Sequence, residues 1–218
     1  MHYLQRNHFG SYNIDDAERP RWTKRTLATG EFDFEDEAGR LLFQVRKGVN
    51  ELGEKVFMVR RPNLLNFSDR LEPEDKRDWY HDMRGVRRVL FNLPALVDPT
   101  RRDEVVWIAE GEKDAMSLIR RGLIATTNFG GAGKWADEYS DTLTGRDCVI
   151  LPDNDPRGWE HADMVWRSLR RTAVRVRVLK LPNLPPKGDV SDWLDLGGTV
   201  EELRRLADTA SIEVRRAS

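Results

Sequence analysis

The 218-residue sequence has little of several features that define common protein classes. A single cysteine, Cys148, excludes an intrachain disulfide framework and a zinc ribbon built from several cysteines, and it is typical of a reducing cytoplasm. No run of about 18 apolar residues occurs, which excludes a transmembrane helix, and the first residues lack the apolar stretch of a signal peptide. We therefore expect a cytoplasmic protein with no zinc and no membrane partner.

An excess of charge of one sign is also lacking. The 36 Lys and Arg residues nearly balance the 37 Asp and Glu residues, and the net charge is -1. This balance excludes a uniformly basic coat for duplex DNA but is compatible with local basic patches and acidic clusters. Seven Trp and eight Phe supply core material, so we expect a folded chain of one large domain or two small ones.

The first hundred residues are typical of antiparallel β-structure with many basic side chains. Alternation over 31–34, a turn signal at 36–39 and apolar segments at 41–45 and 56–59 predict a set of hairpins. We expect an exposed polar excursion over 62–82 and a linker over 94–102. The basic residues form either a solvated sheet face or a surface that contacts phosphates. Those singled out are Arg46, Arg60, Arg61, Arg87 and Arg88.

After residue 100, apolar strands alternate with amphipathic helices, which predicts a parallel α/β sheet. The expected strands are 105–109, 123–127, 148–151 and 174–179, the last at an edge of the sheet. The expected helices are 112–121, 135–143, 158–171, 190–196 and one that begins after Thr199.

Acidic residues follow three of these strands. Glu110 ends the first, Asp153 and Asp155 end the third, and Asp189 and Asp192 follow the fourth. The carboxyl ends of parallel strands share one edge of the sheet, so these carboxylates should lie close together. Gathered carboxylates repel one another unless a cation lies between them, and hard oxygen ligands favour Mg²⁺ or Mn²⁺.

Each of these features also has a local structural interpretation. The aspartates at 153–155 and at 189–192 are suited to cap the helices that follow them. The glycine-rich segment 128–134 is either a tight connection or a phosphate cradle. It is not a P-loop, because Lys134 is followed by Trp135.

Glu110 after the first strand and Asp153 and Asp155 after the third, with Gly158 behind them, resemble the signature of the Toprim domain of bacterial-type primases, topoisomerases and some nucleases. The resemblance spans about residues 103 to 196. Segments 110–114, 128–135 and 187–194 are similar to phage and plasmid primases of the primase–helicase type, and the first half resembles the subdomain that precedes Toprim there. The resemblance implies a Toprim-type parallel sheet (101–208) preceded by a small, mainly β basic subdomain (1–100) and followed by a tail (209–218).

The resemblance further implies RNA primer synthesis on a single-stranded DNA template from nucleoside triphosphates, with Mg²⁺ or Mn²⁺. It makes Glu110, Asp153 and Asp155 the catalytic carboxylates, and these three with Asp189 the metal ligands. The other residues to which it gives roles are Asp114 and Asp192 as a secondary acidic rim, Lys113 and Lys134 as phosphate contacts, and the five arginines above as nucleic-acid contacts.

Two departures from the primase pattern bear on partners. The sequence has neither a cysteine-rich zinc module nor a Walker A helicase motif, so we expect a separate helicase or template-recognition protein. Two alternatives stay open: a Toprim nuclease, in which water replaces the 3′-hydroxyl as nucleophile, and a non-catalytic nucleic-acid-binding replication accessory.

Overall fold

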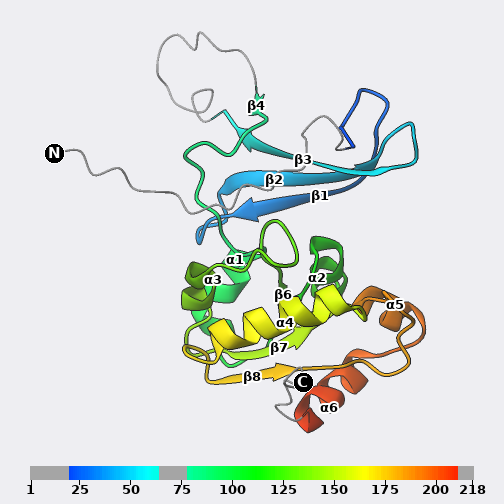
Figure 1. Cartoon of the computed structure of the whole chain (residues 1–218). Coiled ribbons are helices and arrows are strands. Elements are labelled where there is room, and N and C mark those ends of the chain that lie inside the picture. Colours follow the sequence, from blue (N-terminus) through cyan, green and yellow to red (C-terminus); the bar gives the residue numbers. More distant parts are fainter. Residues whose placement is uncertain (1–19, 64–77, 211–218) are drawn as a thin grey trace, which may run out of the picture.

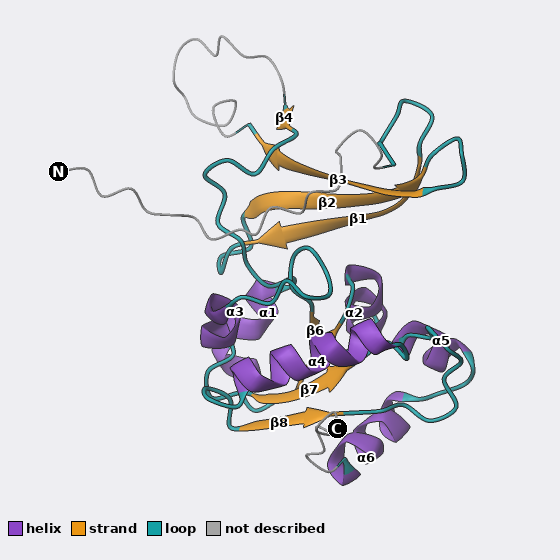
Figure 2. Cartoon of the chain, in the orientation of Figure 1, coloured by secondary structure: helices purple, strands orange, loops and turns teal. Residues whose placement is uncertain are grey.

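The computed structural model describes residues 20–63 and 78–210. The chain forms two four-stranded sheets, an antiparallel one in its first part and a parallel one in its second (Figures 1 and 2). This arrangement confirms the predicted α/β class with a mainly β part ahead of a parallel sheet. Most of the expected excursion over 62–82, and the final residues 211–218, lie outside the described residues.

The antiparallel sheet is a meander in chain order. Its strands are β1 (Leu27–Glu35), β2 (Leu41–Val49), β3 (Lys55–Pro62) and β4 (Trp79–Tyr80). The β1–β2 turn forms where the sequence predicts it, because the Asp36 carboxylate accepts hydrogen bonds from the main-chain N–H groups of Ala38 and Arg40, both at 2.9 Å. Gly39 completes the turn at a positive φ of 75°, a conformation that favours glycine.

The parallel sheet has the strand order β6-β5-β7-β8, which places the fourth predicted strand at an edge as expected. Its strands are β5 (Val106–Ala109), β6 (Ile124–Thr126), β7 (Asp147–Leu151) and β8 (Arg175–Val178). The helices after β5 are α2 (Glu112–Ile119), α3 (Asp137–Thr142), α4 (Pro156–Leu169), α5 (Val190–Asp195) and α6 (Val200–Thr209). Every strand and helix predicted for this half is present.

The predicted linker over 94–102 is wrong. This segment contains helix α1 (Leu93–Val97) and the 3-10 helix η2 (Pro99–Arg101). Pro94 lies in the first turn of α1, where a missing N–H removes no helical hydrogen bond. Leu93 and Leu96, three residues apart, are both buried and hold this short helix against the rest of the protein.

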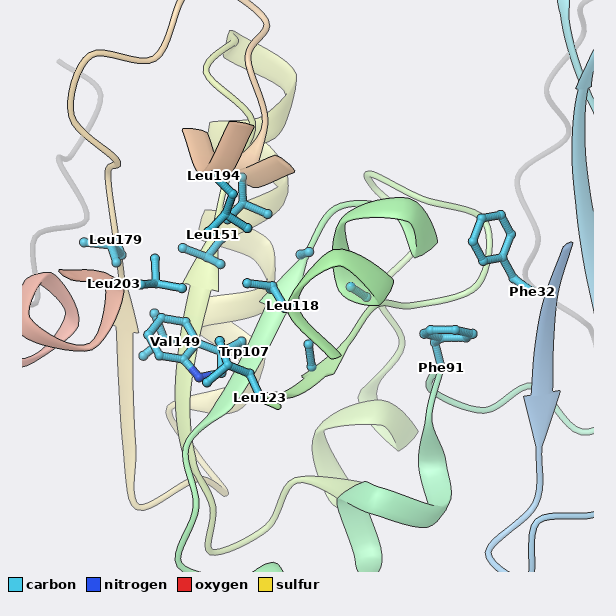
Figure 3. Close-up of a cluster of buried hydrophobic side chains, with 14 of the residues drawn as sticks. Phe32, Phe91, Trp107, Leu118, Leu123, Val149, Leu151, Leu179, Leu194 and Leu203 are labelled. Carbon is cyan, nitrogen blue, oxygen red and sulfur yellow. The ribbon is translucent and has the colours of Figure 1, made fainter. Parts of the chain in front are cut away.

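Helices cover both faces of the parallel sheet because alternate residues of its strands point to opposite sides. In β5, Trp107 belongs to a core with α2, α5 and α6, whereas Ile108 belongs to a second core with α1, α3 and α4. Figure 3 shows the first core, in which Leu118, Leu194 and Leu203 surround the central strands. In the described ranges, no helix combines the length and the apolar character needed to cross a bilayer.

One aromatic cluster joins the two sheets into a continuous core. Phe34 of β1 stacks on Phe43 of β2 with ring centroids 4.5 Å apart. Phe129 packs edge-on against both rings, at 6.1 Å from Phe34 and 5.1 Å from Phe43. Phe91, in the segment before α1, contacts Phe32 (Figure 3) and also Phe34. Because Phe129 belongs to the glycine-rich segment, that segment is anchored against the antiparallel sheet.

Candidate active site

The first acidic positions lie at the carboxyl ends of two neighbouring strands. β5 and β7 pair in parallel, with Ala109 beside Leu151, so the chain leaves the sheet side by side at Glu110 and at Asp153. Thr127, just after β6, donates a 3.0 Å hydrogen bond from its hydroxyl to the main-chain carbonyl of Glu110. The adjacency inferred from the predicted strands is therefore present, and three strands fix the backbone around it.

Asp155 is the N-cap of α4. Its Oδ1 accepts a 2.8 Å hydrogen bond from the N–H of Gly158, as the capping interpretation predicts. A side chain at Gly158 is excluded by packing, because a Cβ there would lie 2.5 Å from the carbonyl oxygen of Asp153. The first turn of α4 therefore packs directly against the loop that carries Asp153 and Asp155, and position 158 has room only for glycine.

The third acidic segment caps α5. Asp189 and Asp192 form a reciprocal capping box: the Asp189 carboxylate accepts from the N–H of Asp192 at 2.8 Å, and that of Asp192 accepts from the N–H of Asp189 at 3.1 Å. On the facing helix α2, buried Asp114 accepts a 2.6 Å hydrogen bond from the Ser191 hydroxyl. This contact ties the first turn of α2 to the first turn of α5.

Asn154 holds the two acidic loops together, a role that the sequence analysis missed. Its side-chain amide donates to the carbonyls of Leu184 at 2.9 Å and Pro185 at 3.0 Å. Its main-chain N–H donates to the carbonyl of Gly188 at 2.9 Å. The loop that carries Asp153 is therefore fastened to the loop that leads into Asp189.

The pKa values show that the carboxylates interact. Burial, with the negative charges of Glu110, Asp114, Asp189 and Asp155, raises the pKa of Asp153 from its ordinary 3.8 to about 7. Burial is also the main cause of the raised pKa values of Glu110 and Asp114. Repulsion of this kind is what a bound cation would relieve.

Two lysines border this cluster. Lys113 of α2, which the sequence analysis singled out, lies 3.4 Å from the Asp189 carboxylate and is largely exposed. Lys47 of β2, which it did not assign to the site, reaches across from the antiparallel sheet, with its Nζ 2.6 Å from Oε2 of buried Glu112. The antiparallel sheet therefore contributes a charge beside the Glu110–Gly111–Glu112 segment.

The glycine-rich segment 128–134 is a tight connection. Gly130, Gly131 and Gly133 all have φ between 71° and 88°, and the Asn128 side chain donates a 2.9 Å hydrogen bond to the carbonyl of Gly131. Lys134 at its end is exposed, and a Cβ at Gly130 would lie 3.4 Å from the Lys134 side chain. Its role as a phosphate contact stays a prediction.

The five singled-out arginines do not form one cluster. Arg46 and Arg60 lie on the same face of the antiparallel sheet, whereas Arg61 points to the opposite face. Arg87 makes a bidentate ion pair with Glu37, at 2.6 and 2.8 Å. The guanidinium of Arg88 lies 5.8 Å from the ring centroid of Phe129, near the glycine-rich segment.

Besides Arg88, three of these arginines lie against aromatic rings. The guanidinium of Arg46 lies 4.9 Å from the ring centroid of Trp22, and that of Arg60 lies 4.0 Å from that of Trp79. Arg61 lies 4.3 Å from the Tyr80 ring. Rings interleaved with positive charge are suited to stacking bases and contacting phosphates.

The acidic cluster fits a divalent cation by its donors. Within 20–63 and 78–210, no three His, Cys, Asp or Glu side chains by themselves enclose a metal position. Mg²⁺ does not require such a cage, because it usually takes one or two carboxylates and completes its shell with water and substrate phosphates. Among the described residues, Oε2 of Glu110 is buried without a hydrogen-bond partner, which is unusual for a carboxylate that has no further role.

No family model matches the sequence, and no curated protein matches it. The fold, in contrast, is that of DnaG primase catalytic cores. A DnaG primase catalytic domain bound to single-stranded DNA matches with a TM-score of 0.56 and 17% identity, over 84% of this chain and 53% of that one. A DNA primase domain from Pseudomonas aeruginosa also matches with a TM-score of 0.56 and 17% identity, over 91% of this chain and 55% of that one.

The zinc-binding and RNA polymerase domains of the Aquifex aeolicus primase match with a TM-score of 0.56 and 18% identity, over 87% of this chain and 45% of that one. The chain thus spans about half the length of the solved chains it matches. At these identities the similarity establishes the fold, and it agrees with the Toprim-type architecture expected from the acidic motifs.

Proposed function

We propose that this chain is a DNA primase-like nucleotidyltransferase that synthesises short RNA primers on single-stranded DNA with Mg²⁺ or Mn²⁺. The observation that carries the proposal is the meeting of Glu110, Asp153 and Asp155 at adjacent strand ends, in a fold shared with DnaG primase catalytic cores. The resemblance to the primase–helicase type of phage and plasmid primase belongs to this proposal.

Glu110, Asp153 and Asp155 would hold the cation, with Asp189 at the far side of the cluster. When bound, the cation would neutralise the triphosphate of the incoming nucleotide and lower the pKa of the primer 3′-hydroxyl. The carboxylates give the site a negative charge that a cation-bound nucleotide would compensate. Asp155 also holds its loop by capping α4, so one residue would serve both the fold and the ligand set.

The other residues of the site supply position and positive charge. Thr127 and Asn154 fix the backbone on which the carboxylates stand. Lys113 and Lys134 would contact phosphates at the rim. Phosphoryl transfer depends chiefly on such positioning and charge compensation, so the contribution of these residues is electrostatic.

The antiparallel sheet would hold the template. Arg46 on Trp22 and Arg60 on Trp79 offer guanidinium groups and rings on one face, a combination that suits single strands because every base has a face that stacks. Arg61 on the opposite face, Arg87 beside Glu37 and Arg88 beside Phe129 would add positive charge outside this face. Unwinding and start-site choice would be left to a separate helicase or template-recognition protein.

The test is de novo synthesis of labelled oligoribonucleotides on mixed single-stranded DNA templates with Mg²⁺ or Mn²⁺. Asp153→Asn and Asp155→Asn are the variants of choice, because asparagine removes the charge and is itself a good N-cap, so the cap of α4 is kept. Both should abolish synthesis while the protein stays folded. Asp141→Asn, an exposed change on α3, is the charge-matched control and should retain it.

Each other outcome has a distinct meaning. Metal-dependent cutting of the template without synthesis would identify the nuclease. Synthesis that appears only when a helicase is added would show that the chain needs a partner. Near-normal turnover in both aspartate variants would overturn the metal site, and inactivity under every condition would favour the binding accessory.

The proposed template surface has its own test, in which Arg60→Gln and Arg61→Gln are combined. Single-stranded DNA affinity should fall, and the slope of log affinity against log salt should lose about 0.7 for each phosphate contact removed. Arg120→Ala with Arg121→Ala, at the other end of α2, removes the same charge as a control. An unchanged salt slope in the Arg60–Arg61 variant would place the template elsewhere.

A further inference from the structure

Two buried polar atoms next to the acidic cluster have no hydrogen-bond partner in the described part of the chain: Oε2 of Glu110 and Nε2 of His161. Both residues line one small cavity between β5, β7 and α4, and the rest of its wall includes Ile108, Ile150 and Ala162. The volume of the cavity is about 10 Å³, which is near the smallest that holds one water molecule.

The protonation of His161 follows from its other nitrogen. The main-chain N–H of Gly133 donates a 3.1 Å hydrogen bond to Nδ1 of His161, so Nδ1 is the acceptor and the proton of the neutral ring is on Nε2. Burial lowers the pKa of His161 to about 4, with the positive charge of Arg157 acting in the same direction, so the ring is neutral at pH 7. Two residues that line this cavity therefore each carry a buried group without a partner in the described ranges, an N–H donor on His161 and a carboxylate acceptor on Glu110.

We propose that one water molecule occupies this cavity, accepts a hydrogen bond from Nε2–H of His161 and donates one to Oε2 of Glu110. His161 is then a positioning residue that orients the Glu110 carboxylate. This inference rests on the proposed function, in which Glu110 is a metal ligand.

Two arguments support the bridge. A buried donor or acceptor left unpaired is strongly unfavourable, and one water would satisfy both atoms at once. Groups that hydrogen-bond to a ligating carboxylate fix its orientation and strengthen metal binding. The bridge would also connect the glycine-rich segment to the metal site, through Gly133, His161 and Glu110 in turn.

Two near-isosteric variants separate the two ends of the imidazole. His161→Asn keeps an acceptor near the position of Nδ1 for Gly133 and removes the donor that faces the cavity. His161→Gln keeps a donor near the position of Nε2. Val165→Ala, at a fully buried position further along α4 that does not line the cavity, is the control for general loss of packing.

The readout is Mn²⁺ binding to the full chain, titrated by electron paramagnetic resonance. We expect His161→Asn to weaken binding about tenfold and His161→Gln to stay within about threefold of wild type. Val165→Ala should lower the unfolding temperature without changing Mn²⁺ affinity. In a Glu110→Gln background, His161→Asn should have no further effect, because the carboxylate on which it acts is already gone.

Three results would overturn the inference. Wild-type Mn²⁺ affinity in His161→Asn, while Glu110→Gln and Asp153→Asn bind weakly, would leave the metal site intact and remove His161 from it. If His161→Asn lowered Mn²⁺ affinity equally in the wild-type and Glu110→Gln backgrounds, His161 would act only through the fold. Wild-type affinity in Glu110→Gln and Asp153→Asn would overturn the metal site, and this inference with it.

A measurement on the unmodified protein covers the case in which His161→Asn does not fold. A high-resolution crystal structure should show one water within hydrogen-bond distance of both atoms. ¹⁵N spectra should show the Nε2-protonated tautomer for one of the four histidines. An empty cavity, or a proton on Nδ1 of His161, would refute the bridge.

Discussion

Replacing Asp153 with asparagine should stabilise the metal-free protein at alkaline pH while abolishing the proposed primer synthesis. The pKa of Asp153 is raised to about 7 in the folded protein by burial and by the surrounding carboxylates, against about 3.9 in an unfolded chain. At pH values between these two pKa values, the Asp153 carboxyl is protonated in the folded state and ionised in the unfolded state. The free energy of unfolding therefore falls as pH rises from about 4 to 7 and stays low above pH 7.

The magnitude follows from that difference in pKa. About three pKa units at ~1.4 kcal/mol each give an upper limit of ~4 kcal/mol. The Asp153 side chain is only partly buried, so solvent screening reduces the value to ~1–2 kcal/mol. A neutral asparagine has no such penalty, and its advantage over wild type should grow by ~1 kcal/mol between pH 5 and pH 8.

Urea unfolding followed by tryptophan fluorescence in EDTA, at both pH values, measures this difference. Excess Mn²⁺ at pH 8 should reverse the order, because a ligand stabilises only the form that binds it. Asp141→Asn is again the control and should show neither effect. A variant that is less stable than wild type at pH 8 without metal, or equally changed at pH 5 and pH 8, would refute the reasoning.

Three further changes test how the site and the sheet that carries it are held. Gly158→Ala places a Cβ 2.5 Å from the Asp153 carbonyl oxygen. Urea unfolding should therefore show a free energy of unfolding lower by ~1–3 kcal/mol, and Mn²⁺ should bind more weakly. Unchanged stability would mean that the turn can accommodate a side chain. Lys47→Met leaves buried Glu112 unpaired and should lower the free energy of unfolding by ~1–3 kcal/mol. Adding Glu112→Gln should restore most of this loss, because the unpaired charge is then removed. No recovery in the double variant would mean that Lys47 does not stabilise the protein through Glu112. Arg177, 2% exposed, donates to Asp147 at 2.6 Å and to the Ala207 carbonyl at 2.9 Å, so Arg177→Met should speed hydrogen exchange in α6, and unchanged exchange would contradict this link between β8 and α6.

The secondary structure of the second half and the order of its acidic motifs could be predicted from local sequence patterns. Period-two and helical patterns are local properties, and strand ends in a parallel sheet share one edge, so Glu110 and Asp153 could be paired before any coordinates existed. The capping of α4 and α5 by Asp155 and Asp189 was also readable, because a cap involves residues only three positions apart.

Other features were decided by tertiary structure. The ion pair of Lys47 with Glu112 joins two sheets, and Asn154 acts through carbonyls some thirty residues away. No local pattern encodes such contacts, because they depend on how the sheets pack and how the loops cross. Packing also made a helix of the segment after Asn92, where a linker over 94–102 was expected.

The cavity shared by Glu110 and His161 is the clearest case of this division. In the sequence, His161 lies among the apolar positions of an amphipathic helix and carries no motif of its own. Its position comes from the packing of α4 on β5 and β7, which brings His161 and Glu110 to the wall of one cavity. The hydrogen bond from Gly133 to Nδ1 then leaves the proton of the neutral ring on Nε2. The acidic positions and their order could be predicted from the chain, but the contacts that orient them form only in the folded molecule.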